Sequence, residues 1–166
     1  MPSHSEIMNS LQSCLRDARW EAGRLNAAAI APAHLLVGLL EDPDDELVRF
    51  LALFHRTPRD LRGRLPHPKA AVLTTADDRL PNDLPYTPAA RSVLTEAVGI
   101  ASSLGHTEIA PVHLLLALAL AIDTDASTFL VDLGLDAHRL RPALRAWYGD
   151  PAALAAIQAE ARNGPA

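Results

Sequence analysis

The stretch Ile30-Ala31-Pro32-Ala33-His34-Leu35-Leu36 recurs 79 residues later as Ile109-Ala110-Pro111-Val112-His113-Leu114-Leu115. The same offset gives 13 identical residues in the 36 positions that run from residue 30 to residue 65. Similarity at one fixed spacing over such a length indicates an internal repeat, in which one structural unit occurs twice. The chain is therefore expected to contain two copies of one unit in tandem.

Each copy shows the apolar periodicity of helices. In the first copy, steps of three and four residues place one apolar stripe on a helical face, formed by Leu11, Leu15, Ala18, Ala22 and Leu25. The counterpart in the second copy is formed by Ala90, Leu94, Ala97, Ala101 and Leu104. Thr57, Thr87 and Asp136 are expected to cap the N-termini of later helices. Asn26 and Gly105 are expected to adopt the left-handed conformation that ends the first helix of each copy.

These patterns predict an all-α fold without strands. It consists of two tandem four-helix repeats related by a pseudo-two-fold axis, plus a C-terminal helix. We expect residues 1–166 to form a single domain, with the first repeat at 5–65, a proline-containing linker at 66–85, the second repeat at 86–147 and the extra helix at 150–162. The second helix of each repeat is almost entirely apolar and is expected at the centre of its repeat.

Composition limits the kinds of partner and the location. Hydrophobic residues make up 49% of the chain, charged residues 21%, and the formal net charge is −5, which is typical of a soluble protein and argues against nucleic acid as a partner. The longest apolar run, residues 114–122, has nine residues, whereas a membrane span needs about 20. Residues 1–6 lack the regions of a signal peptide. We therefore expect a cytoplasmic protein with no membrane partner.

The sequence excludes several kinds of catalytic and metal site. The only lysine, Lys69, follows a proline, so the Gly-Lys-Ser/Thr of a phosphate-binding loop is absent. The seven histidines include no pair at i, i+3 or i+4, and Cys14 is the only cysteine, so the usual zinc ligand patterns are missing. His34 and His113 occupy matching places in the repeats and are expected to be core histidines with a satisfied ring nitrogen. We predict no enzymatic activity, no cofactor and no metal.

Several segments are similar to one known family. They are Arg24-Leu25-Asn26 followed by Ile30-x-x-x-His34-Leu35-Leu36-x-Gly38-Leu39-Leu40, Tyr86-Thr87-Pro88-x-Ala90-Arg91-x-Val93-Leu94, Leu104-Gly105-His106 and Val131-x-Leu133-Gly134-Leu135-Asp136. Together they resemble the Clp repeat, the amino-terminal domain of Clp-type AAA+ unfoldases, over about residues 5–147. The resemblance implies a domain that receives substrates and adaptors and has no catalysis of its own. Because no ATPase module is visible in the sequence, a free-standing copy is expected.

One ligand site of that family is not expected here. In the subgroup that recognises phosphoarginine, each repeat carries Ile-Gly-Thr-Glu-His, whose Glu and Thr bind the ligand. This chain has Pro32 and Pro111 at the Thr positions and Ala33 and Val112 at the Glu positions. The carboxylate and hydroxyl are therefore missing from both repeats, and each proline also removes an N–H donor. We predict no phosphoarginine recognition by the family mechanism.

A second family site is a groove between the first helices of the two repeats, which takes adaptors, hydrophobic peptides and cyclic peptides. The resemblance places its residues at Ile7, Gln12, Leu15, Arg16, Arg19, Tyr86, Arg91, Leu94 and Thr95. A tyrosine among apolar and arginine side chains suits a peptide anchor. The alternative is that Leu15 and Leu94 belong to the core and that the arginines are only solvated.

Two functional hypotheses follow. The first is a non-catalytic protein- or peptide-binding module, expected to be a monomer. Its partner would be a Clp ATPase or protease component, an adaptor or a peptide ligand, and it would modulate Clp-dependent proteolysis or sequester peptides. The alternative is a small-ligand sensor or regulatory protein built on the Clp repeat fold. Arginine outnumbers lysine 14 to 1, which is typical of a GC-rich genome, and we expect an actinobacterial source.

Overall fold

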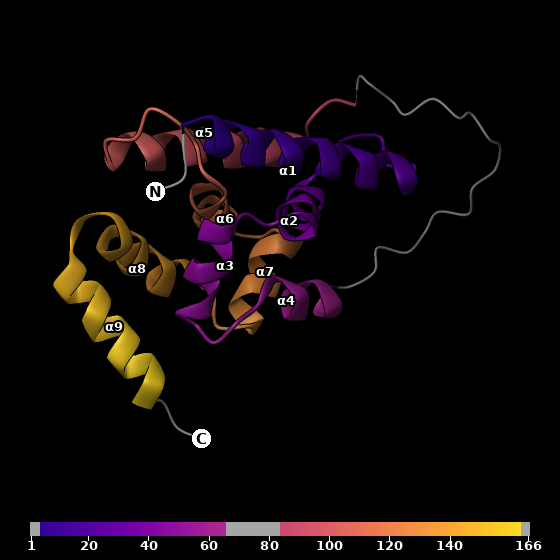
Figure 1. Cartoon of the computed structure of the whole chain (residues 1–166). Helices are drawn as coiled ribbons and strands as arrows, with labels where there is room; N and C mark the ends of the chain where they lie inside the picture. Colours follow the sequence, from indigo (N-terminus) through magenta and orange to yellow (C-terminus); the bar gives the residue numbers. More distant parts are fainter. Residues whose placement is uncertain (1–3, 66–83, 164–166) are drawn as a thin grey trace.

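The computed structural model describes the backbone of residues 4–65 and 84–163 and the side chains of residues 11–65 and 84–160. Nine helices lie within this part of the chain (Figure 1): α1 His4–Arg24, α2 Pro32–Glu41, α3 Asp45–Ala52, α4 Pro58–Arg64, α5 Pro88–Ser103, α6 Pro111–Leu120, α7 Asp125–Asp132, α8 Ala137–Gly149 and α9 Pro151–Asn163. The described residues contain no strand, only an isolated bridge between Ile30 and Tyr86. The prediction of an all-α fold is confirmed.

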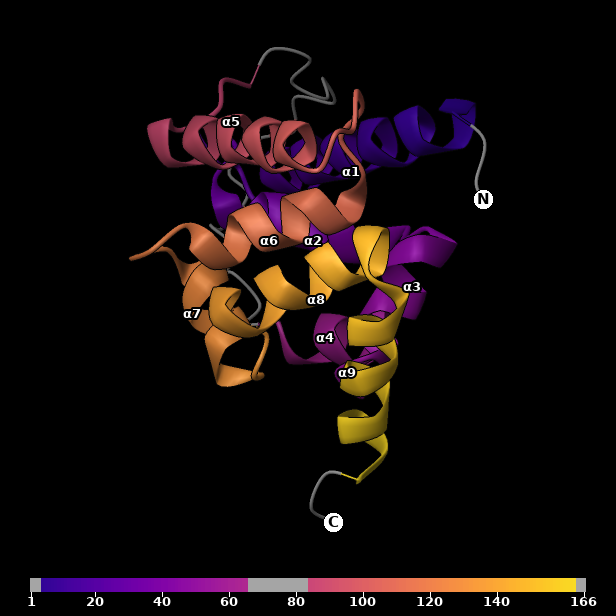
Figure 2. The ribbon, with the colours of Figure 1, turned by 90° about the vertical axis from the view of Figure 1, so that its left-hand side faces the viewer.

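The helices form layers (Figures 1 and 2). α1 and α5 occupy one layer in both views, with α2 and α6 beneath them. α1 packs against α2 and also touches α6, while α5 packs against α6 and also touches α2. α2 and α6 start 79 residues apart, at Pro32 and Pro111. The helix order follows the predicted arrangement of two sets of four plus one, and the pseudo-two-fold axis stays a prediction. Most of the predicted linker, residues 66–83, lies outside the described residues.

The expected caps and helix ends are present. The side-chain oxygens of Thr57, Thr87 and Asp136 each accept a hydrogen bond from the backbone N–H three residues later, at 3.1 Å in all three. Each bond satisfies one of the free N–H groups at a helix start. Asn26 and Gly105 have φ values of 52° and 76°, so both take the left-handed conformation that was predicted.

One apolar cluster continues through both repeats. Its largest fully buried members come from both halves, with Leu35 and Phe50 in one and Leu115 and Leu130 in the other. α1 lies close against α2 at Gly38, where an added methyl group would overlap the carbonyl oxygen of Cys14. The sequence pattern did not reveal this close approach.

Polar contacts also join the repeats. The N–H of Ile30 donates to the carbonyl of Pro85 (2.8 Å), and the N–H of Thr87 donates to the carbonyl of Ile30 (3.0 Å). These bonds attach the start of α5 to the loop before α2. The guanidinium of Arg56 donates to the carbonyl of Leu133 at 2.9 and 3.2 Å.

A further polar contact between the repeats centres on Glu46 of α3. Its Oε1 accepts hydrogen bonds from the hydroxyl of Tyr148 (2.8 Å) and the indole N–H of Trp147 (3.1 Å). The indole also meets the ring of Phe50 edge to face, with centroids 5.7 Å apart. α3 and the end of α8 are thus joined by both polar and aromatic contacts.

The final helix extends away from the bundle (Figure 2). Asp150 caps α9 by accepting from the N–H groups of Ala152 and Ala153, and half-buried Leu154 and Ile157 pack against the core. Within the part of the chain that the structure describes, no single helix has the length and apolarity to cross a membrane. α6 and α7 pass that test only as a pair, and they are bent by 98° at the break between them.

Candidate functional site

The predicted groove residues lie on α1, on α5 and just before α5. Leu15, Leu94 and Tyr86 are half-buried and pack against the core cluster. The more exposed members of the set are Gln12, Arg16, Arg91 and Thr95. Ile7 lies in α1, but its side chain is outside the described part. The structure therefore places these residues in the α1 and α5 layer, with the apolar members partly in the core and partly at the surface.

The arginines of this layer differ in their pairing. Arg16 pairs with the neighbouring Asp17 at 3.2 Å. Arg19 is half-buried, and its Nε is a buried donor with no hydrogen-bond partner among the described residues. Arg91 is exposed and forms no ion pair within the described ranges. Trp20 lies next to Arg19 on α1 and remains 52% exposed. Guanidinium and aromatic groups at such a surface are chemically suited to holding a polypeptide.

The starts of α2 and α6 carry no acidic side chain. Pro32 and Pro111 occupy the first turn, and Val112 is fully buried. The ring Nδ1 of His34 accepts from the N–H of Ala31 at 2.9 Å, and the ring of His113 accepts from Ala110 at 2.8 Å. The prediction that each of these histidines has a satisfied ring nitrogen is confirmed. Burial lowers the pKa of both histidines, that of His113 to about 4, with His106 as a further cause.

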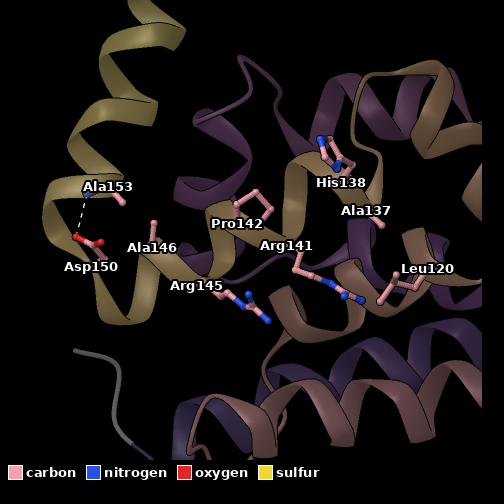
Figure 3. Close-up of a pocket in the computed structure, with 9 residues that line it drawn as sticks. All are labelled: Leu120, Ala137, His138, Arg141, Pro142, Arg145, Ala146, Asp150 and Ala153. Carbon is pink, nitrogen blue, oxygen red and sulfur yellow. Dashed lines mark hydrogen bonds between the residues drawn. The ribbon is translucent and has the colours of Figure 1, made fainter.

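Two cavities lie along α8 instead of along the predicted groove, and Figure 3 shows the larger of them. The larger, of about 540 Å³, is lined by Leu120, Ala137, His138, Arg141, Pro142, Arg145, Ala146, Asp150 and Ala153. The second, of about 350 Å³, is lined by Glu96, Gly99, Ile100, Ser103, Leu104, Leu116, Arg141, Leu144 and Arg145. Both volumes fall in the range of ligand-binding pockets. Arg141 and Arg145 line both cavities, and none of the predicted groove residues lines either.

One feature of the sequence points to these cavities, namely the spacing of two arginines. Arg141 and Arg145 lie at positions i and i+4 of a predicted helix, which places both side chains on one face. The walls that complete the cavities come from α5, α6 and α9, so only the assembled fold brings them together. Among the described residues, no group of three or more His, Cys, Asp or Glu side chains could hold a metal ion.

Comparison with known proteins decides the family. The family model described as Clp repeat (R) N-terminal domain matches residues 7–133 of this chain. The chain belongs to this family. The matched residues start in α1 and end just after α7. They include every predicted groove residue.

A longer relative shows how far the sequence similarity of this Clp repeat domain extends. It is 27% identical over 140 residues to the ATP-dependent Clp protease ATP-binding subunit ClpC of Staphylococcus aureus, an alignment that covers 84% of this chain and 16% of that protein. The chain therefore matches only a small part of that relative's length.

Solved structures show the same fold. The N-terminal domain of the chaperone ClpD from Arabidopsis thaliana has a TM-score of 0.58 and 21% identity, and the match covers 93% of this chain and 99% of that one. The Hsp104 N-terminal domain from Candida albicans has a TM-score of 0.60 and 17% identity, with 84% and 89% covered. At these identities the likeness concerns the fold alone.

Proposed function

We propose that this Clp repeat domain is a non-catalytic module that binds polypeptides or adaptor proteins through the layer formed by α1 and α5. The observation that carries the proposal is the family match over residues 7–133, which includes all of α5 and α1 from residue 7 onward. The finer proposal is that binding there modulates Clp-dependent proteolysis or sequesters peptide ligands.

The chemistry of the layer supports polypeptide binding. Leu15, Leu94 and Tyr86 each pack against the core and stay partly exposed to solvent. A side chain of a bound polypeptide could therefore cover them without disturbing the fold. Arg91 is exposed on α5, three residues before Leu94, and can donate to backbone carbonyls or carboxylates of a ligand. The hydrogen bonds that join Ile30 to Pro85 and Thr87 hold the backbone around Tyr86 in place. A fixed anchor loses less conformational entropy on binding than a free loop does.

The test is a direct binding experiment with a permanently unfolded polypeptide. Reduced, carboxymethylated α-lactalbumin carrying a fluorescent label is titrated with the protein, and anisotropy is recorded. We expect saturable binding that weakens about tenfold or more in Tyr86→Ala combined with Arg91→Ala, because hot-spot anchors of this kind carry most of the binding energy. Arg59→Ala removes an exposed arginine on α4 and is the matched control, which should bind as the unmodified protein does.

Affinity capture from the host supplies the second arm. The protein is expected to retain a Clp ATPase or protease component or an adaptor, and the double variant is expected to lose it. If the protein bound neither the unfolded polypeptide nor any Clp component, the proposal would be contradicted. If a small molecule alone raised the unfolding temperature in that case, the sensor hypothesis would take its place.

A further inference from the structure

The two cavities along α8 combine an apolar wall with a pair of positive charges. Leu120, Pro142 and Ala153 contribute apolar surface to the larger cavity. Arg141 and Arg145 leave α8 on the same side, and the side chain of Arg141 extends toward Leu120 (Figure 3). The smaller cavity is lined by the same two arginines and by Leu144 of α8, by residues of α5, and by Leu116 of α6. One ligand could therefore contact both cavities across this arginine pair.

The arginine pair lacks an internal counter-charge. Both side chains are exposed, and within the described ranges neither forms an ion pair or a hydrogen bond. Two like charges at i and i+4 destabilise a helix, and the chain has acidic residues in excess, with a net charge of −5. Of the acidic side chains that line the cavities, Asp150 caps α9 through two backbone N–H groups and Glu96 lies exposed on α5.

We propose that the α8 cavities bind an acidic peptide segment. Its carboxylates would accept hydrogen bonds from Arg141 and Arg145, and a neighbouring apolar side chain would enter the larger cavity between Leu120 and Ala153. Arginine pairs with carboxylates through parallel N–H donors, which makes the contact directional as well as attractive. The site is separate from the α1 and α5 layer, and the proposal does not depend on the function assigned to that layer.

The surroundings favour a peptide over other anions. A simple inorganic anion would leave the apolar wall unused, because Leu120, Ala137 and Pro142 offer it no donor. Nucleic acid carries a phosphate at every nucleotide and would bring several of them past Glu96 and Asp150, which line the same cavities, whereas a peptide can place uncharged residues there. A peptide that alternates acidic and apolar residues can pair its carboxylates with the arginines and pack its apolar side chains against the apolar wall.

The experiment uses a short fluorescein-labelled peptide of alternating leucine and glutamate, titrated with the full chain and followed by anisotropy. We expect saturable binding that falls about tenfold or more in the double variant Arg141→Gln/Arg145→Gln, because two charge-assisted contacts are lost. Arg59→Gln/Arg64→Gln removes the same charge from exposed positions on α4 and should change the affinity less than about twofold. Circular dichroism and thermal unfolding confirm that each variant is folded.

Two further arms separate this site from general charge attraction. Ala153→Leu, which fills the larger cavity from α9 without removing charge, should weaken binding. Tyr86→Ala with Arg91→Ala should leave it unchanged. Equal weakening by the α4 control, equal binding of a peptide with lysine in place of glutamate, or full binding by Ala153→Leu would each overturn the proposal. Displacement of the peptide by inorganic phosphate at equal concentration would show a simple anion site instead.

Discussion

At the scale of single residues, the imidazole of His113 is held neutral by its neighbours. The N–H of Ala110 donates to its Nδ1 at 2.8 Å, so the proton of the neutral ring is on Nε2, which lies 3.0 Å from Nδ1 of His106. The ring of Tyr148 stacks on it with centroids 5.6 Å apart, and the tyrosine hydroxyl donates to Glu46. Burial, with His106 as a further cause, lowers the pKa of His113 to about 4, and a second proton on Nδ1 would displace the N–H of Ala110.

The first prediction concerns acid stability. Below a pH of about 6.5 the unfolded chain binds a proton at His113. The folded chain does not bind it until the pH is much lower, because folding lowers the pKa of His113 to about 4. Stability should therefore fall as the pH drops from 6.5 to 4, by up to about 3 kcal/mol from this one group. His113→Gln keeps an acceptor for the N–H of Ala110 but cannot titrate, so its urea midpoint should fall less between pH 7.5 and 4.5.

His138→Gln is the matched control for that experiment. His138 is exposed on α8, so its replacement removes an imidazole without touching the buried ring. The control should keep the full loss of stability in acid. If His113→Gln lost as much stability in acid as the unmodified chain, the buried ring would not be the cause.

The second prediction concerns Glu46, whose Oε1 accepts from both Tyr148 and Trp147. Glu46→Ala leaves these two half-buried donors without their acceptor and should lower the free energy of unfolding by about 2 kcal/mol. Glu46→Gln keeps a carbonyl oxygen at that place and should cost less. Urea unfolding at neutral pH measures both variants. Glu96→Ala, an exposed carboxylate on α5, should stay within about 0.5 kcal/mol of the unmodified chain.

At the scale of the elements, the packing of α1 on α2 depends on one missing side chain. A methyl group on Gly38 would overlap the carbonyl oxygen of Cys14 and lie 2.7 Å from the amide nitrogen of Ala18. Both obstacles are backbone atoms, so the helices themselves would have to separate. At the matching place of the second repeat, 79 residues later, the chain has Ala117. The contact at Gly38 therefore relies on a glycine that the second repeat does not have at the matching place.

The third prediction follows from that contact. Gly38→Ala should lower the free energy of unfolding by about 3 kcal/mol or more, because overpacking forces the backbone to move. Gly99→Ala is the control, since an added methyl group on this glycine of α5 meets nothing within 4 Å. That variant should gain about 0.5–1 kcal/mol, the usual benefit of alanine over glycine in a helix. Equal effects of the two substitutions in urea unfolding would contradict the explanation by close packing.

The sequence predicted these elements well wherever local chemistry decides. Thr57, Thr87 and Asp136 cap helices because a short side-chain oxygen at the start of a helix can accept a hydrogen bond from a backbone N–H that has no partner within the helix. The contact at Gly38 could not be predicted, since a glycine in an apolar helix looks the same whether or not another helix touches it. The cavities around Arg141 and Arg145 were missed for a similar reason. Their walls come from residues such as Leu120 and Ala153, which are close together only after folding.

At the scale of the whole molecule, the two repeats share one core and several polar bridges. Buried residues from both halves, including Leu51 and Leu130, belong to a single apolar cluster. Arg56 donates to the carbonyl of Leu133, and Glu46 accepts from two residues of α8. Neither repeat can unfold without exposing apolar surface of the other. The chain should therefore behave as one cooperative unit although its sequence is duplicated.

The last prediction tests this cooperative unfolding with the fluorescence of Trp147, which lies at the contact between α3 and α8. The chain has two tryptophans; Trp20 is 52% exposed on α1, whereas Trp147 lies edge to face with Phe50 across the repeats. Trp20→Phe leaves Trp147 as the only indole, so its fluorescence reports on separation of α3 from α8. Circular dichroism reports on all helices together. In urea the two signals should change with the same midpoint and slope, because coincident transitions are the mark of two-state unfolding. A fluorescence change at clearly lower urea would mean that the repeats separate first and that each keeps its helices without the other.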